Sequence, residues 1–75
     1  MKHLLEIIAK SLVDHPDEVA VTETENEKGI LLQLKVNPQD MGKVIGKQGR
    51  TARSIRTLVK AAASSDEKKI IVEIE

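Results

Sequence analysis

The residues best suited to chemistry lie in VIGKQGR, residues 44–50, where two glycines three positions apart enclose a lysine and a glutamine. Gly46 and Gly49 can adopt positive φ and, because they lack Cβ, they allow a ligand to approach the backbone closely. A helical pattern begins directly after Gly49, and the first N–H groups of a helix are unpaired and lie at the positive end of its dipole. The stretch is therefore a candidate seat for an anion such as a phosphate. Three cations surround it: Lys47, Arg50 and Arg53.

Other glycine-rich nucleotide-binding loops do not fit this spacing. A P-loop needs four residues between its glycines and then Lys-Ser or Lys-Thr, whereas Gly42 and Gly46 are separated by three residues. Lys47 is also followed by a glutamine. A dinucleotide fingerprint would need a glycine where Val44 stands, after a strand rather than a helix. A plain helix-to-helix turn, with Gly46 capping the first helix, remains open from these residues alone.

The charges of the chain are unevenly placed although its formal net charge is zero. Between Met41 and Ser65 there are six lysine and arginine residues and no Asp or Glu, whereas the rest of the chain carries six positive and twelve negative charges. A basic segment on an acidic body attracts an anion to one face and repels it elsewhere. A solvated basic helix face is the alternative explanation of this pattern.

The elements that must position the glycine stretch follow from the hydrophobic pattern. Helical spacing predicts one amphipathic helix that ends near Pro16 and another, rich in alanine, after Gly49. Asn37 followed by proline predicts the start of a short helix. Alternation of apolar and β-branched residues predicts two strands that pair as a hairpin, and a third strand follows the last helix. The predicted helices cover residues 3–14, 38–44 and 50–63, and the predicted strands cover 19–25, 30–36 and 70–74. This order predicts an α+β fold in which helices cover one face of a three-stranded sheet.

The composition narrows the class of protein. A chain of 75 residues predicts one domain, residues 1–75, with a small aliphatic core, because it has no Phe, Trp, Tyr or Cys. Without cysteine there is no disulfide, thiolate nucleophile or cysteine metal cluster. His3 and His15 fit no catalytic or metal-binding spacing and are expected to be exposed, so we expect neither an enzyme nor a cofactor. The sequence shows no leader peptide and no apolar run long enough for a membrane span, which predicts a cytoplasmic protein.

In this context Ile-Gly-Lys-Gln-Gly-Arg between two helices resembles the KH domain, whose GxxG loop holds the backbone of about four nucleotides. The longer stretch VNPQDMGKVIGKQGRTARSIRTLVKAAA is similar to the small bacterial single-KH RNA-binding proteins of the KhpA family, and the likeness covers essentially the whole chain. The resemblance implies a type II KH domain with the order αββααβ and three helices on one face of the sheet. It also implies a protein that binds single-stranded RNA as a post-transcriptional regulator or RNA chaperone.

Carried over residue by residue, the resemblance implies a phosphate-binding loop, two flanking arginines and a hydrophobic groove whose far wall is the last strand. The implied nucleic-acid-binding residues are Ile45, Gly46, Lys47, Gln48, Gly49, Arg50, Arg53, Ile70, Ile71 and Val72. The variable loop SSDEKK lies beside the groove, and its Asp66 and Glu67 would limit which nucleic acids fit. Because the chain has no aromatic residue for stacking, bases would be held by aliphatic packing and by hydrogen bonds to their edges.

The resemblance implies a protein partner as well: a second copy in a homodimer, or another KH protein of the Jag type in a heteromer. Two rival functions remain open. In one, the fold is a dimerisation or adaptor module, and small residues such as Thr57 and Ala61 let two helices approach closely. In the other, the two helices and the glycine turn form a helix-turn-helix reader of duplex DNA, although the flanking strands weaken this interpretation.

Overall fold

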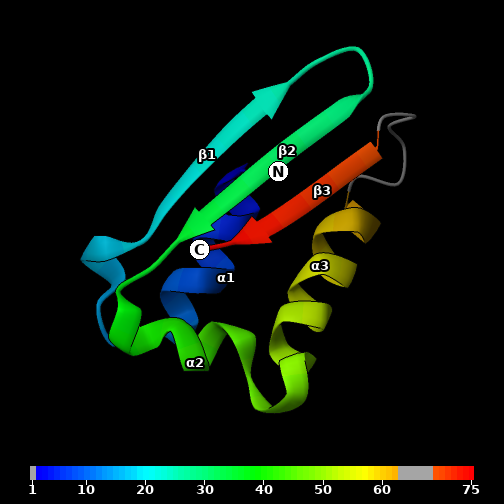
Figure 1. Ribbon diagram of the computed structural model, residues 1–75. Coiled ribbons are helices and arrows are strands. Elements are labelled where there is room, and N and C mark those ends of the chain that lie inside the picture. Colours follow the sequence, from blue (N-terminus) through cyan, green and yellow to red (C-terminus); the bar gives the residue numbers. More distant parts are fainter. Residues whose placement is uncertain (1, 63–68) are drawn as a thin grey trace.

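The computed structural model describes residues 2–62 and 69–75. Its main elements follow in the order α1, β1, β2, α2, α3 and β3 (Figure 1). The helices are α1 (Lys2–Leu12), α2 (Met41–Ile45) and α3 (Arg50–Ala62), and the strands are β1 (Ala20–Glu25), β2 (Gly29–Lys35) and β3 (Lys69–Ile74). One-turn 3₁₀ segments lie at Pro16–Glu18, Pro38–Asp40 and Lys47–Gly49. The predicted α+β order is confirmed. The expectations for Asp66 and Glu67 lie outside the described residues.

The start of the second helix differs in detail from its prediction. Asn37 does act as a cap, and its side-chain oxygen accepts a hydrogen bond from the N–H of Gln39 at 2.8 Å. The segment that it caps is the 3₁₀ turn Pro38–Asp40, and the α-helix begins only at Met41. Pro38 has a fixed φ that suits both a 3₁₀ turn and an α-helix. The pair Asn37-Pro38 therefore predicted where a helical segment starts, but not which of the two types it is.

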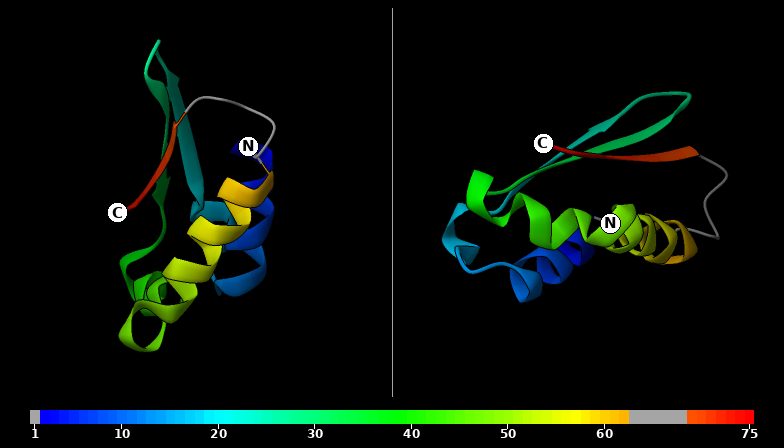
Figure 2. Two further views of the ribbon diagram at one scale, coloured as in Figure 1. Left: turned by 90° about the vertical axis from the view of Figure 1, so that its right-hand side faces the viewer. Right: turned by 60° about the horizontal axis from the view of Figure 1, so that its bottom comes forward.

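The sheet has the strand order β1-β2-β3, with β2 in the centre. β1 and β2 form the predicted antiparallel hairpin, in which Val21 lies opposite Leu34. β2 and β3 run parallel, with Ile30 opposite Ile70, so the chain between them must cross back along the sheet. α2 and α3 make this crossing, and together with α1 they lie on one face of the sheet (Figure 2). No helix of the described residues covers the other face of the sheet.

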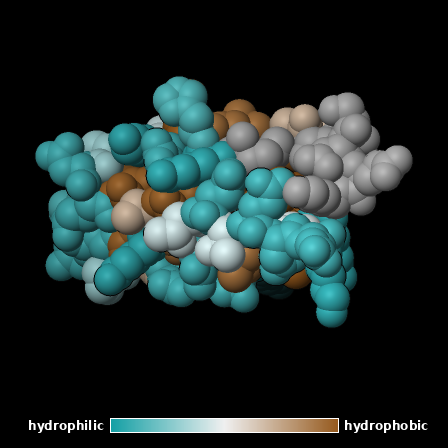
Figure 3. All heavy atoms as spheres, turned by 90° about the horizontal axis from the view of Figure 1, so that it is seen from above, coloured by the Kyte–Doolittle hydropathy of each residue, from teal (hydrophilic) through white to brown (hydrophobic). Residues whose placement is uncertain are grey.

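The core lies between the sheet and the helices and is aliphatic. Every second residue of β2 points into it, which confirms the predicted alternation. The buried cluster consists of Leu5, Ala9, Val21, Ile30, Leu32, Leu34, Val36, Val44, Ile55, Val59, Ile70 and Val72. Leu58 fits the helical pattern of the buried residues of α3 but is 56 % exposed. Seen from above (Figure 3), hydrophilic residues cover most of the surface and hydrophobic ones form separate patches.

Candidate nucleic-acid interface

The glycine loop begins where α2 ends, at Gly46. The N–H of Gly46 donates to the carbonyl oxygen of Gly42 at 2.9 Å, and its φ of 75° and ψ of 177° fall in a region that is essentially restricted to glycine. A Cβ at this position would overlap the hydroxyl of Thr51 and lie 3.0 Å from the Thr51 backbone nitrogen. Gly46 is therefore needed for the turn that ends α2.

The remainder of the loop is a tight turn with a left-handed centre. Gln48 has φ 58° and ψ 26°, and Gly49 has φ 75°. The N–H of Gly49 donates to the carbonyl of Gly46 at 3.2 Å, and the N–H of Arg50 donates to the carbonyl of Lys47. Within the described parts of the chain no acceptor takes the N–H of Lys47 or of Gln48. These two donors, at the entrance to α3, are free to meet an anion.

The charged side chains of the loop and of its two flanking helices are of one sign. Lys47, Arg50 and Arg53 are all exposed, and the sequence of α2, the loop and α3 contains no acidic residue. α3 has 13 residues, long enough for its dipole to add positive potential at the loop. Ile45, the last residue of α2, is 38 % exposed directly beside the loop. The structure thus places six of the predicted residues, those from 45 to 50, in one turn, and Arg53 one turn further along α3.

The three residues expected to form the far wall are separated by the pleat of β3. Ile70 and Val72 are buried and face the helices, whereas Ile71 is 46 % exposed on the opposite face of the sheet. Ile70 and Val72 therefore belong to the core between the sheet and α3. Ile71 lies on the face of the sheet opposite the helices and the glycine loop.

Arg56 joins α3 to the sheet by a contact that sequence reasoning missed. Its Nε donates to the carbonyl oxygen of Val72 at 3.3 Å, which links α3 to the edge strand β3. Arg53 lies three residues before Arg56 and Lys60 four residues after it, so all three cations lie on the same side of α3. They form a basic row along the helix. The i, i+3, i+7 spacing of the three cations was visible in the sequence. The bond to Val72 was not, because it joins residues 16 positions apart.

Asp40 fixes the helix that carries the loop. Its side chain is 1 % exposed and accepts hydrogen bonds from the backbone N–H of His15 at 3.0 Å, from that of Asp14 at 3.3 Å, and from Nδ1 of His15 at 2.9 Å. Burial by itself would raise the pKa of Asp40, but the bonds from His15 and Asp14 outweigh it, and the pKa lies below its ordinary value. Lys43 of α2 also pairs with Asp14. His15, expected to be exposed, is thus partly buried and ties the end of α1 to the start of α2.

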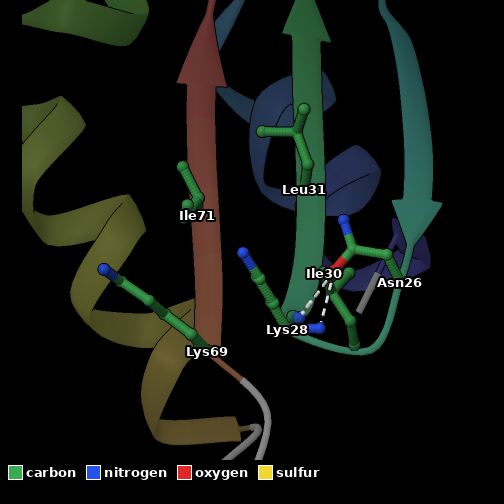
Figure 4. A pocket seen from close by; sticks show the side chains of 7 residues that line it. Asn26, Lys28, Ile30, Leu31, Lys69 and Ile71 are labelled. Atoms are coloured by element: carbon green, nitrogen blue, oxygen red, sulfur yellow. Dashed lines mark hydrogen bonds between the residues drawn. The ribbon is translucent and has the colours of Figure 1, made fainter.

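One hollow lies away from the loop, on the open face of the sheet (Figure 4). Gly29 is among the residues that line it, the apolar side chains of Leu31 and Ile71 lie beside it, and Lys28 and Lys69 add positive charge. No helix of the described residues is long and apolar enough to cross a membrane, and no group of three or more acidic or histidine side chains in these residues is arranged to hold a metal ion.

Comparison with known proteins gives a consistent result. A sequence model of the KH domain of KhpA/KhpB matches residues 2–74. The "RNA-binding protein KhpA" of Clostridium perfringens is 65 % identical over 74 residues, which are 99 % of each chain. The protein of the same name from Listeria monocytogenes is 50 % identical over 99 % of this chain and 97 % of its own. That of Aquifex aeolicus is 47 % identical over 99 % of this chain and 94 % of its own.

Proposed function

The chain belongs to the KhpA/KhpB family of KH domains, and we propose that it binds a short segment of single-stranded RNA with the loop Gly46–Gly49. The observation that carries this proposal is the pair of free N–H groups of Lys47 and Gln48 at the positive end of α3, in a loop whose two flanking helices carry cations and no acidic residue. A phosphate at this position receives two backbone hydrogen bonds together with the charge of the lysine and arginine side chains. The relatives' name, RNA-binding protein, supports the choice of RNA.

The loop supplies position and charge, and base contact has to come from aliphatic surface. The chain has no aromatic side chain, so the usual ~1–3 kcal/mol per stacked base is missing. Two or three phosphate contacts with a single-strand coefficient of about −0.7 each give a log–log salt slope between about −1.4 and about −2.1, near −2 for three contacts. We therefore expect micromolar or weaker affinity from one copy.

Weak binding by one module favours assembly with a second one. Two linked sites make the second contact intramolecular, which raises the overall affinity by about 10²–10⁴ without a new kind of contact. We propose a homodimer, or a heteromer with a larger KH protein of the Jag type, acting on transcripts in the cytoplasm as an RNA chaperone or regulator and not as a catalyst. An adaptor role in which protein contact dominates is the second candidate, and exposed Leu58 beside the small residues Thr57 and Ala61 of α3 supports it.

Binding to matched single-stranded RNA and duplex DNA, followed by fluorescence anisotropy as salt is varied, tests the primary function. Tighter binding of RNA with a slope near −2 supports it. A preference for duplex DNA, or no binding of either, contradicts it.

Sedimentation at tens of micromolar tests assembly, and a strict monomer with nanomolar RNA affinity would refute the need for a second site. Crosslinking to RNA in cells identifies the transcripts, and tight protein partners without crosslinked RNA would favour the adaptor.

A further inference from the structure

Arg56 is anchored to the protein through one end of its guanidinium group. Nε donates to the carbonyl of Val72 in the edge strand, which leaves the two Nη groups at the other end of the planar fork. No acceptor in the described residues engages these Nη groups, and Arg56 is exposed as a whole. The fork is therefore held in orientation while its outer donors remain available, which is the arrangement that gives arginine its bidentate specificity.

The position of this fork differs from that of the phosphate-binding loop. Arg56 lies six residues after Arg50, about 9 Å further along the axis of α3 at 1.5 Å per residue. It is turned toward β3 and its Nε is occupied, so it cannot swing freely to the loop. The loop and Arg56 lie on the same helix, so an RNA strand that extended from the loop along α3 would bring a base within reach of the Arg56 fork.

We propose that Arg56 determines base specificity by binding a base edge that carries two adjacent acceptors. This inference rests on the proposed RNA binding. Guanine offers O6 and N7 on one edge, and cytosine offers O2 and N3. Adenine and uracil place a donor beside each acceptor on the corresponding edges, so one Nη group would face an N–H. The site therefore prefers guanine or cytosine at one position of the bound segment.

The experiment compares oligouridine with the same oligomer carrying one central A, C or G, using fluorescence anisotropy. Wild-type protein should bind the C or the G oligomer at least fivefold more tightly than the U and A oligomers, the lower end of what a bidentate pair contributes. Arg56→Lys keeps the charge and removes the fork, so it should bind oligouridine within about threefold of wild type and lose the preference. Lys60→Gln, in the same basic row, should weaken the binding of all four oligomers by the same factor and should keep the preference for C or G.

The outcomes separate this inference from the function on which it rests. If wild-type protein binds no RNA, both fail. If it binds all four oligomers equally, or if Arg56→Lys keeps the preference, the inference alone is wrong. If Arg56→Lys melts much lower than wild type, arginine side-chain resonances of wild-type protein decide instead. The Arg56 Nη and Nε signals should shift with the preferred oligomer and not with oligouridine, and shifts of equal size would overturn the proposal.

Discussion

Replacing Gly49 with Asp or with Asn separates the charge of the loop from its shape. A Cβ at Gly49 would meet no heavy atom within 4 Å, and its φ of +75° lies in the left-handed region that Asn and Asp enter more readily than other residues. We expect each variant to lose about 1 kcal/mol of folding free energy, which lowers the Tm of a domain of this size by about 4–8 °C. Position 49 directly precedes α3, where the helix dipole favours a negative charge, so the Asp variant should melt no lower than the Asn variant.

For RNA affinity we expect the reverse order: the Asp variant should bind more weakly than the Asn variant. The carboxylate of Gly49→Asp would stand where we propose that a phosphate binds. Two like charges about 4 Å apart repel by about 1 kcal/mol in water and about 4 kcal/mol at the effective dielectric constant near a protein surface. The Asp variant should therefore bind RNA between about fivefold and about a thousandfold more weakly than the Asn variant.

Fluorescence anisotropy with a short labelled RNA measures the affinities, and circular dichroism melting shows that both variants are folded. Gly49→Asn is the matched control, because it has nearly the same volume and backbone preference without the charge. Equal affinities of the Asp and Asn variants, with both proteins folded, would refute the phosphate seat at this loop. Gly46 is unsuitable for this comparison, since any side chain there meets Thr51 and disturbs the start of α3.

Removing charge at the loop by Lys47→Gln or Arg53→Gln should weaken RNA binding and reduce the salt slope by about 0.7 per contact, whereas Lys10→Gln on α1 should change neither; equal losses would indicate diffuse attraction. The pKa of Asp40 lies below its ordinary value, so its bonds stabilise the fold above that value and are lost as the pH falls through the folded-state pKa. Asp40→Asn should therefore flatten the decline of Tm below about pH 4, and a decline like that of wild type would contradict this. Gly29→Ala should cost about 1–3 kcal/mol of folding free energy, because its Cβ would overlap the Lys69 carbonyl between β2 and β3, and an unchanged Tm would show that the strands separate without loss.

Local signals in the sequence were sufficient to predict the elements of the fold. The alternation of Ile30, Leu32 and Leu34 is a property of neighbouring residues, and it placed the buried face of β2 correctly. Asn37 and Gly46 mark boundaries through their own backbone preferences, and the structure has a cap and a helix end at these positions. Such signals depend only on residues within one turn or one strand, so they can be read before the chain is folded.

Contacts between distant segments could not be predicted in this way. The run Ile70-Ile71-Val72 has no polar residue to show which side faces water, so the position of Ile71 on the open face followed only from its pairing with β2. Asp40 resembled the other surface carboxylates, because its donors lie 25 and 26 residues away. The sequence supplies the charge of Asp40, but the antiparallel pairing of β1 with β2 brings the residues before β1 close to those after β2 and so decides which groups meet.

The position of the loop depends on residues that would not contact RNA. α2 has only five residues, too few to be stable as an isolated helix, so its orientation must come from tertiary contacts. Asp40 at its start binds the segment after α1, and Gly46 at its end sets the direction in which the chain leaves. The contacts of Asp40 and the backbone of Gly46, at the two ends of α2, therefore fix the orientation of the free N–H groups of the loop. The cations of α3 attract anions whatever the orientation of the loop. We therefore expect a variant that keeps every cation and loses Gly46 to attract anions still, but not to hold one phosphate in a fixed place, and the proposed base recognition by Arg56 should be lost with it.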